Sequence, residues 1–286
     1  MGTQLEIWID RAERNWLEVL YLHAEQQFRG CSLPSHDHTH HLRVWNLCRE
    51  LLREISAFNS NMDQALVEGV LIAAFFHDLG MVRSMSEEHG RLGVDLCRNW
   101  FREHTQDPPG NFPEILRAIE LHDRKGEPVY APFQPGVPPE ILGILTVADD
   151  LEALGTIGIY RYAEIYLRRG LPLEELGNRV LANAERRFGM FRENCRLCPA
   201  LIRKYRPQYE ELRCFYMEYN LQLQTVSGPG EVRSGPLGVV NYIRNADLYP
   251  GRPYPGRPYP GQGDGIPEAL TDYFRILEHE LDQARM

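Results

Sequence analysis

Apolar residues recur along this chain at intervals of three and four positions, the spacing that places side chains on one face of an α-helix. Alternation with a period of two, which is typical of strands, is almost absent. The pattern therefore predicts an all-α protein. The expected helices cover residues 4–28, 38–55, 66–77, 87–104, 113–122, 138–168, 173–189 and 199–223.

Three of the predicted apolar stripes contain a histidine or an aspartate. His40 begins the first, His77 ends the second, and Asp149 ends the third, while Asp78 directly follows His77. A histidine or carboxylate that faces a core is unfavourable unless another group offsets its burial, and a divalent metal ion suits all four side chains at once. A single buried histidine is more often a hydrogen-bonded core residue, so the prediction of a metal site depends on the combination.

Two neighbouring aspartates compete for the third stripe. Asp149 continues the apolar face of the predicted helix, whereas Asp150 lies off that face. We therefore expect Asp149, together with His40, His77 and Asp78, to bind the metal.

These motifs together resemble a known protein family. The strings S-H-D-H-T-H and H-H-L-R-V at residues 35–44, F-F-H-D-L-G at 75–80 and V-A-D-D-L-E-A-L-G at 147–155 are similar to the H…HD…D signature of the HD superfamily of metal-dependent phosphohydrolases. The extension G-T-I-G-I-Y-R at 155–161 resembles one stand-alone bacterial branch. The resemblance covers about residues 15–224. It implies an HD-type orthogonal helical bundle that hydrolyses phosphate esters or anhydrides, without implying a particular substrate.

Composition indicates a soluble globular protein. Of 286 residues, 43% are hydrophobic and 25% are charged. The chain has no uninterrupted run of about 18 apolar residues, and Asp10, Glu13 and Trp16 interrupt the place where a signal peptide would be. We therefore expect a cytoplasmic protein without a membrane partner.

Net charge and cysteine content exclude two further classes. A formal net charge of −9 argues against general nucleic-acid binding, and a locally basic stretch at residues 186–206 is interpreted as solvated helices. Six cysteines in a chain of this length do not suggest a disulfide scaffold, and the single C-x-x-C at 195–198 has no second pair to complete a zinc site.

Composition changes near the C-terminus. We predict a helical bundle over residues 1–224, a flexible Pro/Gly-rich linker over 225–265 that contains the tandem Y-P-G-R-P repeat, and an amphipathic helix over 266–286. That last helix either folds back on its own domain or meets a protein partner, and the sequence does not choose between them.

The predicted site suits phosphate chemistry. One divalent ion with open coordination positions can polarise a phosphoryl oxygen and acidify a water molecule. Mixed His and Asp ligands favour Mn²⁺, Fe²⁺, Co²⁺, Ni²⁺ or Zn²⁺ over Ca²⁺, and the resemblance makes Mn²⁺ the first choice. Asp78 is also the candidate catalytic carboxylate.

Additional groups are expected to bind the small phosphorylated substrate. His122 ends a third histidine-containing stripe, and Lys125 follows it; His89 follows the His-Asp doublet. The alternatives are a capped helix end for His122 and a solvated surface position for His89. His36 is expected to lie next to the ligands without binding the ion itself.

Three functions remain open at this point. The resemblance favours a phosphohydrolase that acts on a nucleotide. In two-metal members of the superfamily, histidines similar in order to His89 and His122 bind a second ion, but Asp123 stands where such members often have another histidine, so a second metal is left open. If both histidines are ligands, a two-iron oxygenase on the same scaffold is the alternative, and a non-catalytic metal-binding interaction module is the third.

Overall fold

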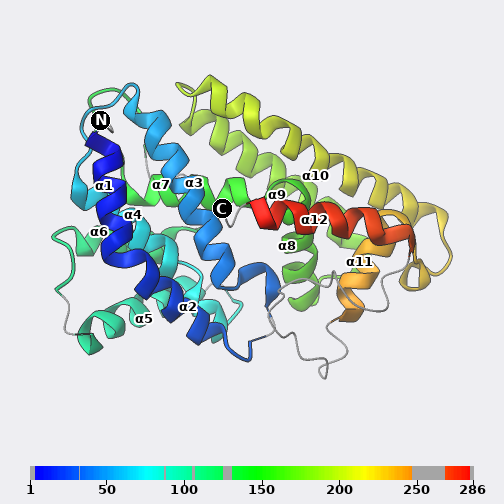
Figure 1. The fold of residues 1–286 in the computed structure, drawn as a ribbon. Helices are drawn as coiled ribbons and strands as arrows, with labels where there is room; N and C mark the ends of the chain where they lie inside the picture. The colour runs from blue at the N-terminus through cyan, green and yellow to red at the C-terminus, as the bar shows by residue number, and fades with distance from the viewer. Residues whose placement is uncertain are drawn as a thin grey trace. The chain divides into compact units, whose positions relative to one another are not determined.

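The computed structural model describes residues 4–31, 33–86, 88–104, 107–124, 131–246 and 268–283. Within these ranges the regular structure is helical and contains no strand, which confirms the all-α prediction (Figure 1). The chain divides into two compact units. The first contains Met1–Leu151 and Met190–Ile202, and the second contains Glu152–Gly189 and Arg203–Met286. This division differs from the predicted boundary at residue 224.

The first unit is a helical bundle built around α4 (Gln64–Phe76). Every residue of α4 from Val70 to Phe76 is buried, because α1, α3 and α6 all pack against this helix. The stretch Gln64–Val82 is long and apolar enough to cross a membrane, but it is mostly buried inside the fold, as the core helix of a soluble protein is. The other elements of this unit are α1 (Gln4–Ala12), the π-helical turn η1 (Glu13–Leu17), α2 (Glu18–Phe28), η2 (Pro34–His36), α3 (His38–Ser56), η3 (Leu79–Val82), α5 (His89–Glu103), α6 (Phe112–Leu121) and α7 (Ile141–Glu152) up to Leu151.

The second unit has its own apolar core. Tyr216 and Tyr219, both fully buried, donate their hydroxyl hydrogens to the backbone oxygens of Ile159 and Leu173, at 2.9 Å in each case. Such bonds satisfy buried hydroxyls while the rings fill the core. The elements that contribute to this unit are α8 (Gly155–Arg168), α9 (Leu173–Asn194), α10 (Pro199–Thr225), η4 (Pro229–Glu231), α11 (Gly235–Ala246), η5 (Glu268–Leu270) and α12 (Thr271–Gln283).

The helix predicted over residues 138–168 is divided into α7 and α8. Gly155 has φ +64°, a left-handed conformation that glycine adopts without steric penalty. Three residues later, a Cβ atom on Gly158 would lie only 2.2 Å from the Ala153 carbonyl oxygen, so the chain turns tightly here. The apolar period continues across this break, which is why periodicity alone predicted a single helix.

Part of the predicted linker is folded. Residues 225–265 were expected to be unstructured, but α11 lies inside that range and buries Leu237, Val240 and Ile243 in the core of the second unit. The prediction was wrong because Gly and Pro residues on both sides of this short amphipathic segment dominate the composition of residues 225–265. The tandem Y-P-G-R-P repeat lies outside the described residues.

The apolar face predicted near the C-terminus is buried within the second unit. Leu270, Phe274, Leu277 and Leu281 belong to the same core cluster as α8, α10 and α11. Glu280 of α12 also accepts a hydrogen bond, at 3.1 Å, from the backbone nitrogen of Ile157 in the first turn of α8. A carboxylate at this end of a helix is favourable because the amide hydrogens there lack partners within the helix.

Candidate metal centre

His40 occupies the first turn of α3, and the sequence before it explains why the helix begins there. Asp37 has extended backbone geometry, and its carboxylate accepts hydrogen bonds from the backbone nitrogens of Thr39, at 2.9 Å, and His40, at 3.4 Å. This is an N-cap, which satisfies amide hydrogens that the helix cannot. The cap fixes where α3 begins and therefore the direction in which His40 points.

The other three predicted ligands come from helix ends. His77 immediately follows α4, Asp78 immediately precedes η3, and Asp149 lies in the last turn of α7. Burial of all four side chains is nearly complete: His40 and His77 are 0% exposed, Asp78 is 4% exposed and Asp149 is 5% exposed. Four polar groups thus converge in the buried interior.

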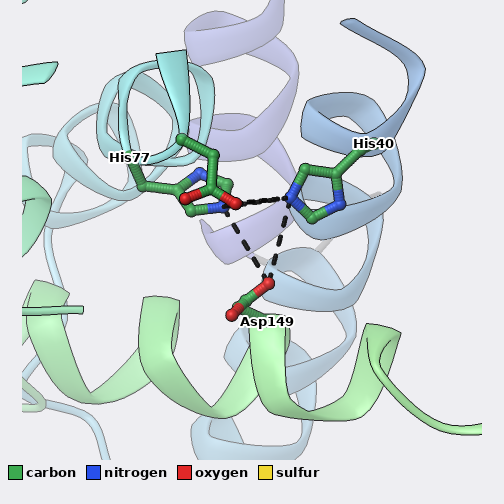
Figure 2. A group of neighbouring side chains, drawn as sticks. His40, His77 and Asp149 are labelled. Carbon is green, nitrogen blue, oxygen red and sulfur yellow. Dashed lines mark hydrogen bonds and ion pairs between the residues drawn. The ribbon is translucent and has the colours of Figure 1, made fainter. Parts of the chain in front are cut away.

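The convergence is close enough for a single ion. The His40 and His77 Nε2 atoms are 3.2 Å apart, and Asp78 Oδ2 lies 3.4 Å from the first and 3.6 Å from the second. Asp149 Oδ1 lies 3.9 Å from His40 Nε2 and 4.0 Å from His77 Nε2. Figure 2 shows how these three side chains point towards one another. Ligand atoms about 2.1 Å from one metal ion lie roughly 3.0 to 3.4 Å apart, so small adjustments would complete the coordination.

His89 and His122 form a second group with Asp78. His122 Nε2 lies 3.0 Å and His89 Nε2 lies 3.3 Å from Asp78 Oδ1, and the two Nε2 atoms are 3.4 Å apart. The two oxygens of Asp78 therefore face different histidine pairs. His89 is 3% exposed, so the alternative of a solvated surface histidine is wrong.

Hydrogen bonds to the backbone determine which nitrogen each ring offers. Three of these histidines place Nδ1 within 2.9 Å of the carbonyl oxygen three residues earlier: His77 on Ala74, His89 on Ser86 and His122 on Ile119. A carbonyl oxygen only accepts, so Nδ1 carries a hydrogen; Nε2 is then an acceptor when the ring is neutral and a second donor, towards Asp78, when the ring is protonated. With neutral rings both groups bring nitrogen and carboxylate acceptors together, and a cation satisfies such a set. The donor set fits a divalent transition metal.

Glycines allow the second group to form. A Cβ atom on Gly80 would lie 2.0 Å from the His89 carbonyl oxygen, and one on Gly93 would lie 2.6 Å from the Phe76 carbonyl oxygen. The beginning of α5 therefore lies directly against the backbone that carries Asp78. Any larger residue at these two positions would separate His89 from the carboxylate.

Electrostatic effects on these groups follow from burial and mutual proximity. Burial would raise the pKa of Asp78, but the charge of His77 and hydrogen bonds from His122, His40 and His89 lower it well below its usual value. Burial lowers the pKa of His77 to about 4, although the charge of Asp78 opposes this change. Burial would also lower the pKa of His89, but its hydrogen bond to Asp78 and the charge of that carboxylate raise it to about 9.

The remaining predicted residues have different positions. Asp150 is buried, but the four-ligand group contains Asp149 in its place. His36 lies behind the ligands, with Nε2 3.8 Å from Asp78 Oδ2 and Nδ1 2.6 Å from the Ser35 hydroxyl oxygen. Lys125 lies outside the described residues.

His41 is a buried neighbour of the ligands that sequence reasoning did not select. Its ring centroid lies 5.1 Å from that of His77 and 5.4 Å from that of His40. The only local signal was its position next to His40, and a helix turns consecutive side chains about 100° apart, which does not suggest a shared site.

Comparison with known proteins agrees with this geometry. Residues 38–154 match the family model described as HD domain, and this range begins just before His40 and ends shortly after Asp149. The chain contains an HD domain. The resemblance inferred from the motifs is thereby confirmed, and the buried histidine and aspartate cluster is consistent with the metal site of that superfamily, whose members are mostly metal-dependent hydrolases. No curated protein and no solved structure matches the chain.

Proposed function

We propose that this HD-domain protein is a metal-dependent hydrolase that cleaves a phosphate ester or anhydride bond in a small metabolite, most reasonably a nucleotide. The observation that carries the proposal is the convergence of His40, His77, Asp78 and Asp149 in a buried environment, with one ligand atom from each residue within 4.8 Å of the others. The mixture of imidazole and carboxylate ligands favours a divalent transition ion over Ca²⁺, and the resemblance to the HD superfamily makes Mn²⁺ our first choice among these.

The four residues would hold the ion, which when bound supplies Lewis acidity towards a phosphoryl oxygen and lowers the pKa of water. Asp78 is the proposed catalytic residue, because only one of its oxygens faces His40 and His77. Its other oxygen would accept a hydrogen bond from the attacking water. His89 and His122, next to that oxygen, are the groups we propose to contact the substrate phosphate.

A second candidate function follows from the second group. Asp78, His89 and His122 could together hold another metal ion, since their three donor atoms lie within 3.4 Å of one another. Two ions that share Asp78 would suit either a two-metal hydrolase or a two-iron oxygenase. The oxygenase requires both histidines as ligands, whereas the hydrolase with one ion leaves them for substrate.

The decisive experiment is a substrate screen with the metal-free protein reloaded with one ion at a time. Nucleotides, phosphosugars and phosphodiesters are each supplied with Mn²⁺, Fe²⁺, Co²⁺, Ni²⁺, Zn²⁺ or Ca²⁺, and released phosphate or pyrophosphate is measured. We expect turnover of at least one nucleotide with a transition ion, loss of turnover on chelation, and no recovery in His77→Ala when metal is restored. Absence of turnover with every ion, combined with oxygen consumption by the iron form, would replace the hydrolase by the oxygenase.

A further inference from the structure

His41 and His77 share one backbone acceptor. The Nδ1 atom of His41 lies 3.0 Å, and that of His77 lies 2.9 Å, from the carbonyl oxygen of Ala74. A carbonyl oxygen has two lone pairs and accepts two hydrogens, so both rings donate to it through Nδ1. Ala74 belongs to the last turn of α4, where carbonyl groups have no amide donor within the helix, so the two imidazoles fill that role.

The shared acceptor connects two helices at the metal centre. His41 and His40 belong to the first turn of α3, whereas Ala74 and His77 belong to the end of α4. The Nε2 atoms of His40 and His77 lie 3.2 Å apart, close to the roughly 3.0 to 3.4 Å between neighbouring ligand atoms of one ion, and separation of these helix ends by one ångström would lengthen that distance to about 4.2 Å. A hydrogen bond between these two helix ends acts directly on that distance.

Packing alone does not explain an imidazole at position 41. The ring contacts Phe28 and stacks on Phe75 with centroids 5.6 and 6.2 Å away, surroundings that a phenyl ring would suit. The Nδ1 hydrogen of His41 is directed at the Ala74 carbonyl oxygen, so Nε2 of the neutral ring is an acceptor. Among the described residues, no protein atom hydrogen-bonds to that Nε2, which is an unfavourable state for a buried acceptor.

We propose that His41 is a positioning residue that holds the first turn of α3 against the last turn of α4 through the Ala74 carbonyl, and so keeps His40 and His77 at the spacing of two ligands of one ion. Its consequence for metal binding rests on the proposed function. The helix contact itself, and the ring state of His77, exist without any metal.

The test uses two substitutions that separate hydrogen bonding from packing. His41→Phe keeps the aromatic ring and removes the donor, whereas His41→Asn keeps a donor close to the position of Nδ1 and leaves unfilled volume. His23→Phe is the matched control, because His23 is also an imidazole of the first unit with an Nε2 that lacks a described partner, but its ring contacts are with Phe76, Trp100 and His104.

The first measurement is the affinity of the full-length metal-free protein for Mn²⁺ alone, together with the thermal unfolding midpoint. Loss of a group that orients a metal ligand typically weakens binding by about 10- to 100-fold, and we expect this loss in His41→Phe without a decrease in the unfolding midpoint. His41→Asn should unfold at a lower temperature yet bind Mn²⁺ nearly as tightly as wild type, and His23→Phe should retain its affinity. The proposal would be overturned if the Mn²⁺ affinity fell in parallel with the unfolding midpoint in both position-41 variants. Unchanged Mn²⁺ affinity in His41→Phe would overturn it as well.

The second measurement needs no metal. Nitrogen-15 spectra of the histidine rings, with His77 assigned from a His77→Gln variant, should show wild-type His77 protonated at Nδ1. We expect His77 in His41→Phe to populate a second state that differs from the ring protonated at Nδ1, and His77 in His41→Asn to remain protonated at Nδ1. A wild-type protein that binds no divalent ion, but whose His77 responds in this way, would support the positioning role and refute the proposed function. Identical His77 spectra in wild type and His41→Phe would refute the positioning role.

Discussion

Gly80→Ala should disable the second histidine group while leaving the four-ligand group in place. The added Cβ atom would lie 2.0 Å from the His89 carbonyl oxygen and 2.9 Å from the Gly93 backbone nitrogen. Real Cβ atoms essentially never approach other atoms closer than 3.0 Å, so η3 and the beginning of α5 must separate by about 1.0 Å (3.0 − 2.0). Neither contact is with a flexible side chain, so the backbone itself must move.

The size of the effect follows from that displacement. His89 Nε2 lies 3.3 Å from Asp78 Oδ1, and a further 1.0 Å in the same direction gives about 4.3 Å, beyond hydrogen-bond and ligand distance. Displacement of a catalytic group by about 1 Å reduces turnover roughly 100-fold. Overpacking of this kind also destabilises a fold by about 1 to 3 kcal/mol.

The assay compares kcat/KM on the substrate found in the screen, Mn²⁺ binding and urea unfolding for Gly80→Ala and Gly110→Ala. Gly110 is the control because a Cβ atom there meets nothing within 4 Å. We expect a large loss of kcat/KM in Gly80→Ala, retained binding of one Mn²⁺ ion, and near-wild-type behaviour of Gly110→Ala. A folded Gly80→Ala protein with wild-type turnover would show that His89 has no part in the reaction.

Three further predictions concern ligands and pH. Asp149→Asn should strip most bound metal, whereas Asp150→Asn should keep it; elemental analysis of both variants that showed the reverse would make Asp150 the ligand in place of Asp149. If His89 and His122 contact substrate, their alanine variants should keep about one ion per chain and lose turnover; a wild-type stoichiometry near two would make them ligands. Burial lowers the pKa of His23 to about 4 from 6.5, so the unfolded state binds more protons between these values: stability from this group is complete above pH 6.5 and declines towards pH 4. Denaturant titrations at pH 5 and 7.5 should show a smaller pH effect in His23→Phe than in wild type, and equal effects would contradict this cause.

Much of the fold was readable from local patterns. Helix period and end signals predicted α3, α5, α6 and α10 to within a few residues, because those signals depend on neighbours in the chain. The same period placed His40, His77 and Asp149 on inward faces, and it favoured Asp149 over Asp150 as the metal ligand. Where a single period ran through a tight turn, as between α7 and α8, the prediction joined two helices.

The sequence by itself therefore determined most of the helix content and the face on which three of the four proposed ligands, His40, His77 and Asp149, lie. Tertiary structure decided three features that a helical period cannot express. Two glycines let α5 approach η3 and so bury His89. His41 and His77 meet at one carbonyl oxygen, and α11 belongs to a second core. A periodic pattern gives the angle of a side chain around its own helix axis. The distance between two helices is a separate quantity, set by the side chains and glycines that pack between them.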